Sequence, residues 1–282
     1  MDYIKVKGLS KSYSDIKALK NLSIEIEAGT LFGILGPNGA GKSTLIKILA
    51  TLIEPDSGEV FINNINLIKN SRKIRELIGY VAQDIALDKI LTGRELLDFQ
   101  SDLYHINKNK KFERINKLID QLEMNDWIDR KCGTYSGGMK RRIDLAAGLL
   151  HLPQVLILDE PTVGLDIESR NIIWQLLKDL RNNGMTIILS SHYLDEIDKL
   201  ADRLVIIDDG RVIAKGTPAE LKNKLGGDRV TLKVREFSNQ EEAKNICQIL
   251  SSIDGISQII INEAQGFSIN FVADKEKDLL TK

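Results

Sequence analysis

The chain has 282 residues, of which 43% are hydrophobic and 28% charged. This composition argues against a disordered chain and is typical of a globular protein with one large domain and room for a smaller one. The formal net charge of -1 argues against the broad basic surface of a protein that grips nucleic acid, so we expect no nucleic-acid partner.

The first part of the chain predicts a hairpin, a buried strand and a helix. Apolar residues at strand spacing favour a hairpin of two strands over residues 2–13 and 18–29, and residues 30–36 are a short apolar run that ends in glycine. Residues 42–52 then take helical spacing. The chain therefore starts with β structure and leads through a glycine turn into its first helix.

Residues 84–152 are predicted to form an inserted helical subdomain. Amphipathic segments follow one another at residues 93–106, 108–122 and 138–150. The basic run Lys108–Lys111, at the start of the second segment, is interpreted as a solvated helix face.

Strands and helices alternate again after this helical block. Strands are predicted at residues 155–161, at 185–192 and in a hairpin over 203–216 that turns at Asp209 and Gly210, and helices at 169–183 and 194–201. Such alternation predicts an α/β fold, in which helices cover the faces of a parallel sheet.

The composition changes after residue 226. Residues 228–282 predict the order strand, helix, strand, strand and the start of a further helix. We therefore expect a large domain over residues 1–226 and a small C-terminal α+β domain over residues 227–282.

A phosphate-binding loop is the strongest motif of the chain. The segment GPNGAGKST fits the pattern G-x-x-x-x-G-K-[ST], with a predicted strand before it and a predicted helix after it. Its main-chain N–H groups can wrap a β-phosphate, Lys42 can neutralise phosphate oxygens, and the Ser43 hydroxyl can complete Mg²⁺ coordination. The loop thus predicts a nucleoside triphosphate site formed by Gly36, Asn38, Gly39, Ala40, Gly41, Lys42, Ser43 and Thr44.

Two carboxylates, Asp159 and Glu160, end the predicted strand at residues 155–161. Ligands of doubly wound sheets bind at the carboxyl ends of strands. Since neighbouring strand residues point to opposite sides, the two acids are expected to do different work. Asp159 can hold Mg²⁺ through a water, and Glu160 can deprotonate the attacking water, although two acids at a strand end can also form a plain solvated turn.

Single polar residues at other strand ends are weaker candidates. Gln83 and His192 each close a predicted strand, and their side chains would emerge beside the phosphate loop if both strands join one sheet. Tyr13 ends the first strand, where its ring could stack on adenine or merely cover a sheet edge.

The segment YSGGMKRR predicts a second anion site. Ser136 is a typical N-cap residue, and Gly137 and Gly138 leave the start of the following helix bare. The free N–H groups and the positive end of the helix dipole attract phosphate there.

The ordered set of these motifs closely resembles the ATP-binding subunit of ABC transporters over residues 1 to about 226. The resemblance implies ATP and Mg²⁺ as ligands, with Ser136, Gly137 and Gly138 on the γ-phosphate. Met139 stands where the family usually has glutamine, and together with the small C-terminal domain this resembles the branch of drug- and antibiotic-resistance exporters. The implied site is the following: catalytic Glu160, His192, Lys42 and Gln83; metal-binding Ser43, Gln83 and Asp159; and, besides the phosphate loop, nucleotide-binding Tyr13, Ser136, Gly137, Gly138 and Asp166.

The same resemblance implies a dimer. In this family the signature segment of one ATP-binding domain faces the phosphate loop of another, so the partner is expected to be a second copy or a homologous ATPase domain, with Asp166 at the seam. A separate transmembrane permease subunit is the second implied partner. No apolar stretch approaches the roughly 18 residues that span a bilayer, so any membrane role must come through a partner. The resemblance implies a cytoplasmic chain on the inner face of the cell membrane.

Two other functions are less well supported. A soluble ABC ATPase of DNA repair, translation or cluster assembly would be expected to carry a tandem second ATPase half, a long coiled-coil insertion or a basic surface. A different phosphate-loop kinase or GTPase would not carry YSGGM and His192, and the chain has no N-K-x-D segment that reads guanine.

Overall fold

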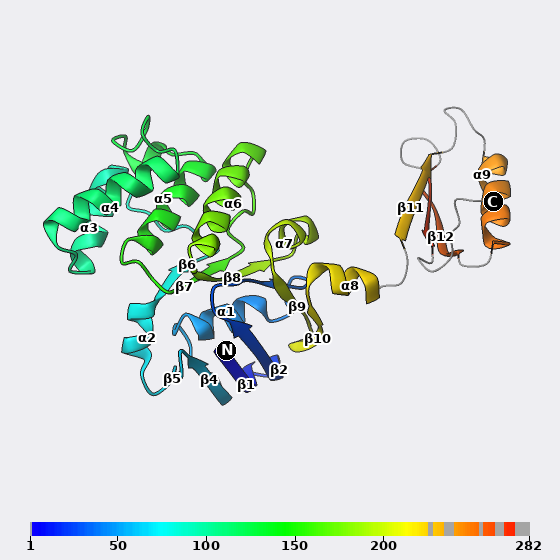
Figure 1. Ribbon diagram of the computed structural model, residues 1–282, viewed down its shortest axis with the longest axis horizontal. Helices are drawn as coiled ribbons and strands as arrows, with labels where there is room; N and C mark the ends of the chain where they lie inside the picture. Colours follow the sequence, from blue (N-terminus) through cyan, green and yellow to red (C-terminus); the bar gives the residue numbers. More distant parts are fainter. Residues whose placement is uncertain (1, 225–227, 234–239, 254–255, 263–267, 274–282) are drawn as a thin grey trace. The chain divides into compact units, whose positions relative to one another are not determined.

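The chain is described from a computed structural model that covers residues 2–224, 228–233, 240–253, 256–262 and 268–273 (Figure 1). Its internal contacts divide it into two compact units, Met1–Pro218 and Ala219–Lys282. The division falls at the start of helix α8 (Pro218–Lys224), a few residues before the domain boundary that the composition predicts at residue 226, which stays a prediction.

A six-stranded sheet forms the centre of the first unit, in the order β10, β9, β3, β8, β7, β6. The strands from β9 to β6 are parallel, as predicted, and β10 is antiparallel to β9. β7 is buried along its whole length, which explains its unbroken run of four aliphatic residues. The strands are β3 (Leu31–Leu35), β6 (Ile78–Val81), β7 (Val155–Asp159), β8 (Thr186–Ser191), β9 (Arg203–Asp208) and β10 (Arg211–Gly216).

A four-stranded antiparallel sheet has the order β2, β1, β4, β5. The predicted hairpin of β1 and β2 is confirmed. In β2, Leu22, Ile24 and Ile26 are buried and the residues between them are exposed, because successive side chains point to opposite faces. β4, β5 and helix α2 (Ser71–Leu77) were not predicted. The strands are β1 (Asp2–Tyr13), β2 (Ile16–Glu27), β4 (Ser57–Ile62) and β5 (Ile65–Asn66).

Helix α1 (Lys42–Leu49) packs in one hydrophobic core with strands of both sheets (Figure 1). Its residues Leu45, Ile46, Ile48 and Leu49 are each 0% exposed. Each such side chain stabilises the fold by about 1.5–3 kcal/mol. The helix that starts at the phosphate loop is therefore held firmly by the core.

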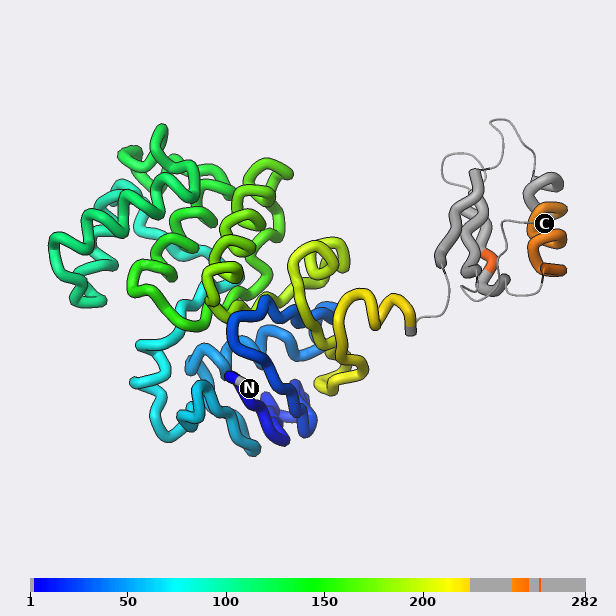
Figure 2. The backbone as a smooth tube through the Cα atoms, viewed as in Figure 1, coloured from blue at the N-terminus to red at the C-terminus, as the bar shows by residue number. Residues whose placement is uncertain are grey.

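The segment between β6 and β7 forms a helical block, as predicted, and appears in green in Figure 2. Helix α3 begins at a capping box of Thr92 and Glu95. Helix α5 begins after Ser136, whose Oγ accepts the Met139 N–H at 3.3 Å, so the predicted N-cap is confirmed. The block contains α3 (Gly93–Leu103), α4 (Lys108–Gln121), a 3₁₀ turn (Cys132–Thr134) and α5 (Gly137–Leu149).

The interpretation of Lys108–Lys111 as a solvated face was wrong for one residue. Lys111 is only 8% exposed, and its Nζ lies 2.7 Å from a carboxylate oxygen of Asp98 and 2.8 Å from one of Asp102. The two carboxylates of α3 compensate the cost of placing an ammonium group out of water. Lys111 therefore ties α4 to α3.

Helices α6 (Ile167–Asn182) and α7 (Leu194–Leu200) confirm the remaining helix predictions of the first unit. Glu196 of α7 is 2% exposed. It accepts hydrogen bonds from the Thr162 hydroxyl at 2.6 Å and the Trp174 indole at 2.9 Å. This carboxylate links the loop after β7 to both helices.

The second unit contains a three-stranded antiparallel sheet in the order β11, β13, β12, with α9 packed on β12 and β13. The predicted order of strand, helix, strand, strand is confirmed, and the predicted final helix lies outside the described residues. No helix in the described part of the chain is long and apolar enough to cross a membrane. The elements are β11 (Asp228–Lys233), α9 (Gln240–Ser251), β12 (Ile256–Asn262) and β13 (Ser268–Ala273).

Candidate active site

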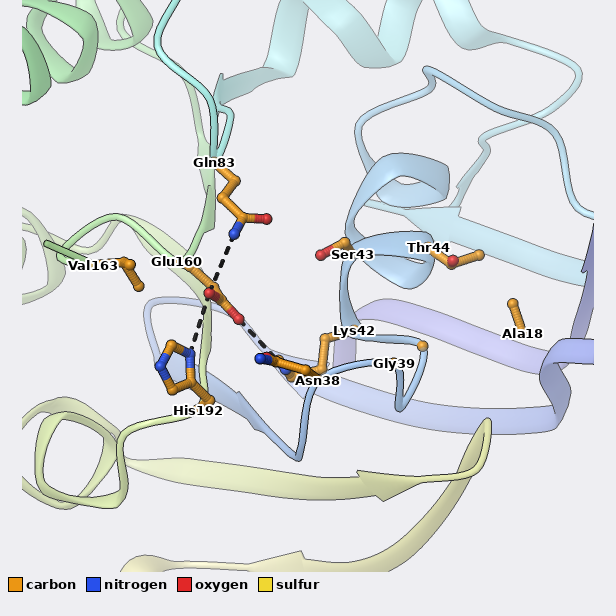
Figure 3. A pocket seen from close by; sticks show the side chains of 11 residues that line it. Ala18, Asn38, Gly39, Lys42, Ser43, Thr44, Gln83, Glu160, Val163 and His192 are labelled. Carbon is orange, nitrogen blue, oxygen red and sulfur yellow. Dashed lines mark hydrogen bonds and ion pairs between the residues drawn. The ribbon is translucent and has the colours of Figure 1, made fainter.

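The carboxyl ends of four parallel strands bring the predicted polar residues to one edge of the central sheet. The phosphate loop follows β3, Gln83 follows β6, Glu160 follows β7 and His192 follows β8. These segments surround a cavity of about 440 Å³ (Figure 3). The cavity is lined by Ala18, Asn38, Gly39, Gly41, Lys42, Ser43, Thr44, Gln83, Glu160, Val163 and His192.

The phosphate loop has a backbone that its glycine residues make possible. Gly41 has a φ of +105°, and a Cβ at this position would clash with the carbonyl oxygen of Ala18 in β2. The Lys42 side chain, 4% exposed, turns back over the loop and its Nζ donates to the carbonyl oxygens of Gly36 at 2.9 Å and Pro37 at 3.0 Å. The loop thus places a buried cation beside the N-terminus of α1. The cation and the helix N-terminus both favour the binding of an anion at this point.

Glu160 is the centre of the polar cluster (Figure 3). Its Oε1 lies 3.4 Å from Lys42 Nζ, and its Oε2 lies 3.2 Å from Nδ1 of His192 and accepts a hydrogen bond from Gln83 Nε2 at 3.5 Å. The residue has a φ of 48°, and its N–H donates to Ser190 Oγ at 3.0 Å. Such a backbone is uncommon for a residue other than glycine and costs free energy, which is characteristic of functional sites.

Asp159 and Glu160 have different partners, as the alternation of strand residues predicts. Asp159 is 1% exposed; its Oδ1 accepts hydrogen bonds from Ser190 Oγ at 2.6 Å and Ser43 Oγ at 3.3 Å. The Ser190 hydroxyl therefore contacts both acidic residues. The plain solvated turn that we considered for this pair is wrong, because both acids are buried.

The residues around Ser43 fit a magnesium ion. Ser43 Oγ and Asp159 Oδ1 lie 3.3 Å apart, so both oxygens can face one hydrated Mg²⁺, with Ser43 as a direct ligand and Asp159 acting through a water. The described residues contain no group of three or more His, Cys, Asp or Glu side chains that could hold a metal by themselves. In nucleotide sites Mg²⁺ commonly takes its further ligands from water and substrate phosphates.

Three residues predicted to bind nucleotide lie outside the set of described residues that line the cavity: Tyr13, Gly36 and Ala40. Tyr13 is 45% exposed, and the Nζ of Lys11 lies 5.9 Å from its ring centroid. Ala40 is buried, and its carbonyl oxygen accepts the Gly210 N–H at 3.0 Å. Stacking of Tyr13 on adenine stays a prediction.

The signature residues Ser136, Gly137 and Gly138, and Asp166 with them, are also outside the described cavity lining. Asp166 caps α6: its two carboxylate oxygens accept the Ser169 N–H at 2.8 Å and the Ser169 hydroxyl at 2.9 Å. Gly138 packs so tightly on this turn that a Cβ there would clash with Ser169 Oγ. Within one chain, the start of α5 therefore contacts α6. The signature residues of that chain do not line its own phosphate cavity.

Comparison with known proteins identifies the family. The sequence profile of the ABC transporter family matches residues 19–163. The chain belongs to the ATP-binding subunits of the ABC transporter family. It is thus an ATP-binding protein and an ATPase, as the motifs predict.

Named relatives of this ABC subunit include resistance proteins. It is 42% identical to the daunorubicin resistance ATP-binding protein DrrA3 of Streptomyces coeruleorubidus, over 83% of this chain and 74% of that protein. It is 40% identical to the linearmycin resistance ATP-binding protein LnrL of Bacillus subtilis, over 80% of this chain and 73% of that protein.

Solved structures share the fold of this ABC subunit. CbiO1 of Clostridium perfringens, part of the ABC transporter complex cbiONQ, is 32% identical with a TM-score of 0.73, over 80% of this chain and 92% of that one. The ATP-binding cassette MJ0796, in a dimeric post-hydrolysis state with ADP and Pi, is 29% identical with a TM-score of 0.70, over 76% of this chain and 98% of that one. The predicted phosphate-loop ATPase fold is thereby confirmed.

Sequence reasoning missed three residues of this ABC site. Ala18 and Val163 line the cavity, and Ser190 contacts both acidic residues. A small or aliphatic side chain carries no chemical pattern that marks it as a site residue. Ser190 could have been found, because it lies two residues before His192 in a strand expected to end at the same edge.

The two glycines at the start of the signature helix should respond differently to a methyl group. We expect Gly138→Ala to lower the free energy of unfolding by about 1–3 kcal/mol, because its Cβ would overlap Ser169. At Gly137 a Cβ would meet nothing within 4 Å. Gly137→Ala should therefore raise the free energy of unfolding by up to about 1 kcal/mol, because alanine has the better helix propensity. Urea unfolding of both variants measures the difference, and equal effects would show that the Gly138 contact is not tight.

Proposed function

We propose that the chain is the ATP-hydrolysing subunit of an exporter of drug- or antibiotic-like molecules and acts as a head-to-tail dimer on a separate transmembrane subunit. The observation that carries the proposal is the separation, within one chain, of the phosphate cavity from the signature helix α5. The names of the resistance relatives support the class of substrate. On this account the protein lies on the cytoplasmic face of the membrane, and Gln83 and the helical block transmit motion to the membrane subunit.

The residues of the cavity have separate roles in this proposal. The Lys42 ammonium is 3.4 Å from the Glu160 carboxylate. Triphosphate competes for that cation, so binding frees the Glu160 carboxylate to take a proton from the attacking water. His192 Nδ1, 3.2 Å from Oε2, keeps the carboxylate oriented toward the cavity. Mg²⁺ held by Ser43, Asp159 and Gln83 neutralises phosphate charge when it is bound.

The second half of each ATP site comes from another copy. Helix α5 has 13 residues, and its bare start offers main-chain N–H groups and the positive end of a helix dipole to a γ-phosphate. Each copy carries its own Lys42, Glu160 and His192, so a homodimer forms two equivalent sites, with Asp166 at the seam. The charge on the γ-phosphate is then balanced from both sides only when the dimer closes.

Mixing two inactive variants tests this arrangement. Lys42→Ala removes the phosphate-loop cation, and Gly137→Asp places a carboxylate at the start of α5, where an added Cβ would meet nothing within 4 Å. Each variant alone is expected to hydrolyse ATP at about 1% of the wild-type rate or less. A one-to-one mixture should recover up to roughly a quarter of the wild-type rate, because half of the dimers then contain one intact composite site out of two.

A mixture that stays as inactive as its two components would contradict the shared site. A mixture of Lys42→Ala with Glu160→Gln is the matched control, since both changes lie in the phosphate cavity and no dimer of these two variants contains an intact composite site. This mixture should stay inactive.

A further inference from the structure

Arg141, on the signature helix α5, is a buried cation that the proposed ATP chemistry does not use. It is 3% exposed. Its Nη1 donates to the carbonyl oxygen of Ala82, and its Nη2 donates to that of Gln83 at 2.7 Å. Both carbonyl groups lie just beyond β6, the last strand of the described central sheet. The guanidinium thus joins the signature helix to the main chain of a cavity residue.

Placing this cation out of water is costly, so the contact needs an explanation. Burial lowers the pKa of Arg141, and the nearest carboxylate oxygen, Asp144 Oδ2, lies 3.5 Å from its Nη1. Burial also raises the pKa of Asp144 to about 6, so this partner is still mainly ionised at neutral pH and loses its charge at lower pH. The strongest contacts of the guanidinium are the two main-chain carbonyl groups, and its planar fork is suited to hold two acceptors at once.

The contact has consequences at both ends. The Gln83 side chain reaches Glu160 at 3.5 Å, so the position of the Gln83 main chain sets how this amide meets the cavity. Four and five residues before Arg141, Gly137 and Ser136 form the start of α5. A displacement of α5 would therefore be passed through Arg141 to Gln83.

We propose that Arg141 is a positioning residue that clamps Gln83 to the signature helix and so couples the two ATP sites of a dimer. The coupling rests on the proposed function, in which α5 serves the nucleotide of the partner copy and Gln83 serves the nucleotide of its own chain. When α5 engages the partner's nucleotide, the clamp moves Gln83 in the chain's own cavity. Each site then senses the closure of the other.

Arg142 provides a matched control on the same helix. Its Nη1 donates to the carbonyl oxygens of Leu122 and Glu123, each at 3.1 Å, and burial lowers its pKa as it does for Arg141. The chemistry is therefore the same, an arginine bonded to two carbonyl groups, but these groups belong to the helical block and not to the Gln83 segment.

Hydrogen–deuterium exchange of the nucleotide-free full chain tests the clamp without any ATPase assay. Arg141→Gln is expected to speed exchange of the amides of residues 82–84 at least about tenfold, because the segment loses its two bonds to α5. Arg142→Gln should leave that segment within about twofold of wild type. Equal exchange rates of residues 82–84 in wild type and Arg141→Gln would overturn the clamp. Equal acceleration of this exchange in Arg141→Gln and Arg142→Gln would also overturn it, because the change would then be a general loosening of the helical block.

A double-mutant cycle on ATP hydrolysis tests the role of the clamp. Arg141→Gln should lower kcat about tenfold with KM for ATP changed less than about twofold, since a misplaced side chain affects the reaction more than binding. In a Gln83→Ala background the same change should lower kcat less than about twofold, because its effect passes through Gln83. The Hill coefficient for ATP should also fall toward 1 in Arg141→Gln.

If the double variant of Arg141→Gln and Gln83→Ala lost kcat by the full product of the two single-variant losses, the proposal would be overturned. For Arg142→Gln combined with Gln83→Ala, we expect the losses in kcat to multiply in this way. If Arg141→Gln does not fold, Arg141→Lys takes its place, since lysine keeps the charge but cannot hold two carbonyl groups in a fork. Absence of ATPase activity in wild type would count against the proposed function, while the exchange experiment would still decide on the clamp.

Discussion

Glu160→Gln is expected to lower kcat for ATP hydrolysis by at least about a hundredfold while the chain still binds ATP. The amide has nearly the shape of the carboxylate and can keep its place between Lys42 and His192, but it cannot take a proton from water. ATP then stays bound between two copies, so a stable dimer should accumulate. Steady-state ATPase assays give the rate, and size-exclusion chromatography with ATP gives the dimer.

Glu196→Gln is the matched control for this variant. Glu196 is also buried, at 2% exposure, and its Oε1 accepts from Thr162 and Trp174, a role that a glutamine oxygen can keep. We expect kcat of Glu196→Gln within about threefold of wild type, since it lies in no contact with the cavity chemistry. Comparable losses in both variants would refute the assignment of Glu160 as general base, and a Glu160→Gln protein that remains monomeric with ATP would contradict the shared site.

Lys42→Ala is expected to weaken ATP binding by at least about a hundredfold. The ammonium is the buried cation of the cavity that lies over the phosphate loop, and charge-assisted hydrogen bonds of this kind are worth about 1.5–3 kcal/mol each. Loss of two such bonds to the phosphates gives this factor. Calorimetric titration with ATP measures the affinity.

The exposed Lys47 on the same helix α1 is the control for Lys42. Lys47→Ala removes the same charge from the same helix but on its solvent side, where screening makes it weak. We expect the ATP affinity of Lys47→Ala within about twofold of wild type. An unchanged affinity in Lys42→Ala would rule out its predicted role.

The sequence predicts the site well wherever local pattern and topology agree. The apolar run of β3 is followed by the phosphate loop, that of β7 by Glu160 and that of β8 by His192. A parallel sheet places the carboxyl ends of such strands at one edge. The N-cap Ser136 is predictable because capping depends on a few neighbouring residues. These features need no knowledge of distant contacts.

The sequence does not predict features that depend on distant pairing. β4 is short and buries only Val60 and Ile62; it forms a strand because it pairs with β1, far away in the chain. Two neighbouring cations, Lys140 and Arg141, look alike in the sequence, but only helix packing decides that Arg141 points to the carbonyl groups after β6. The inward turn of Lys111 toward α3 escapes prediction for the same reason.

The central claim is that each ATP is held by two copies of the chain, and the dependence of ATPase rate on protein concentration tests it most directly. The initial rate per chain is measured over a dilution series, with light scattering at the same concentrations to give the fraction of dimer. We expect the rate per chain to fall with the dimer fraction and to approach zero where only single chains remain. A rate per chain that stays constant down to concentrations at which all protein is monomeric would contradict the claim.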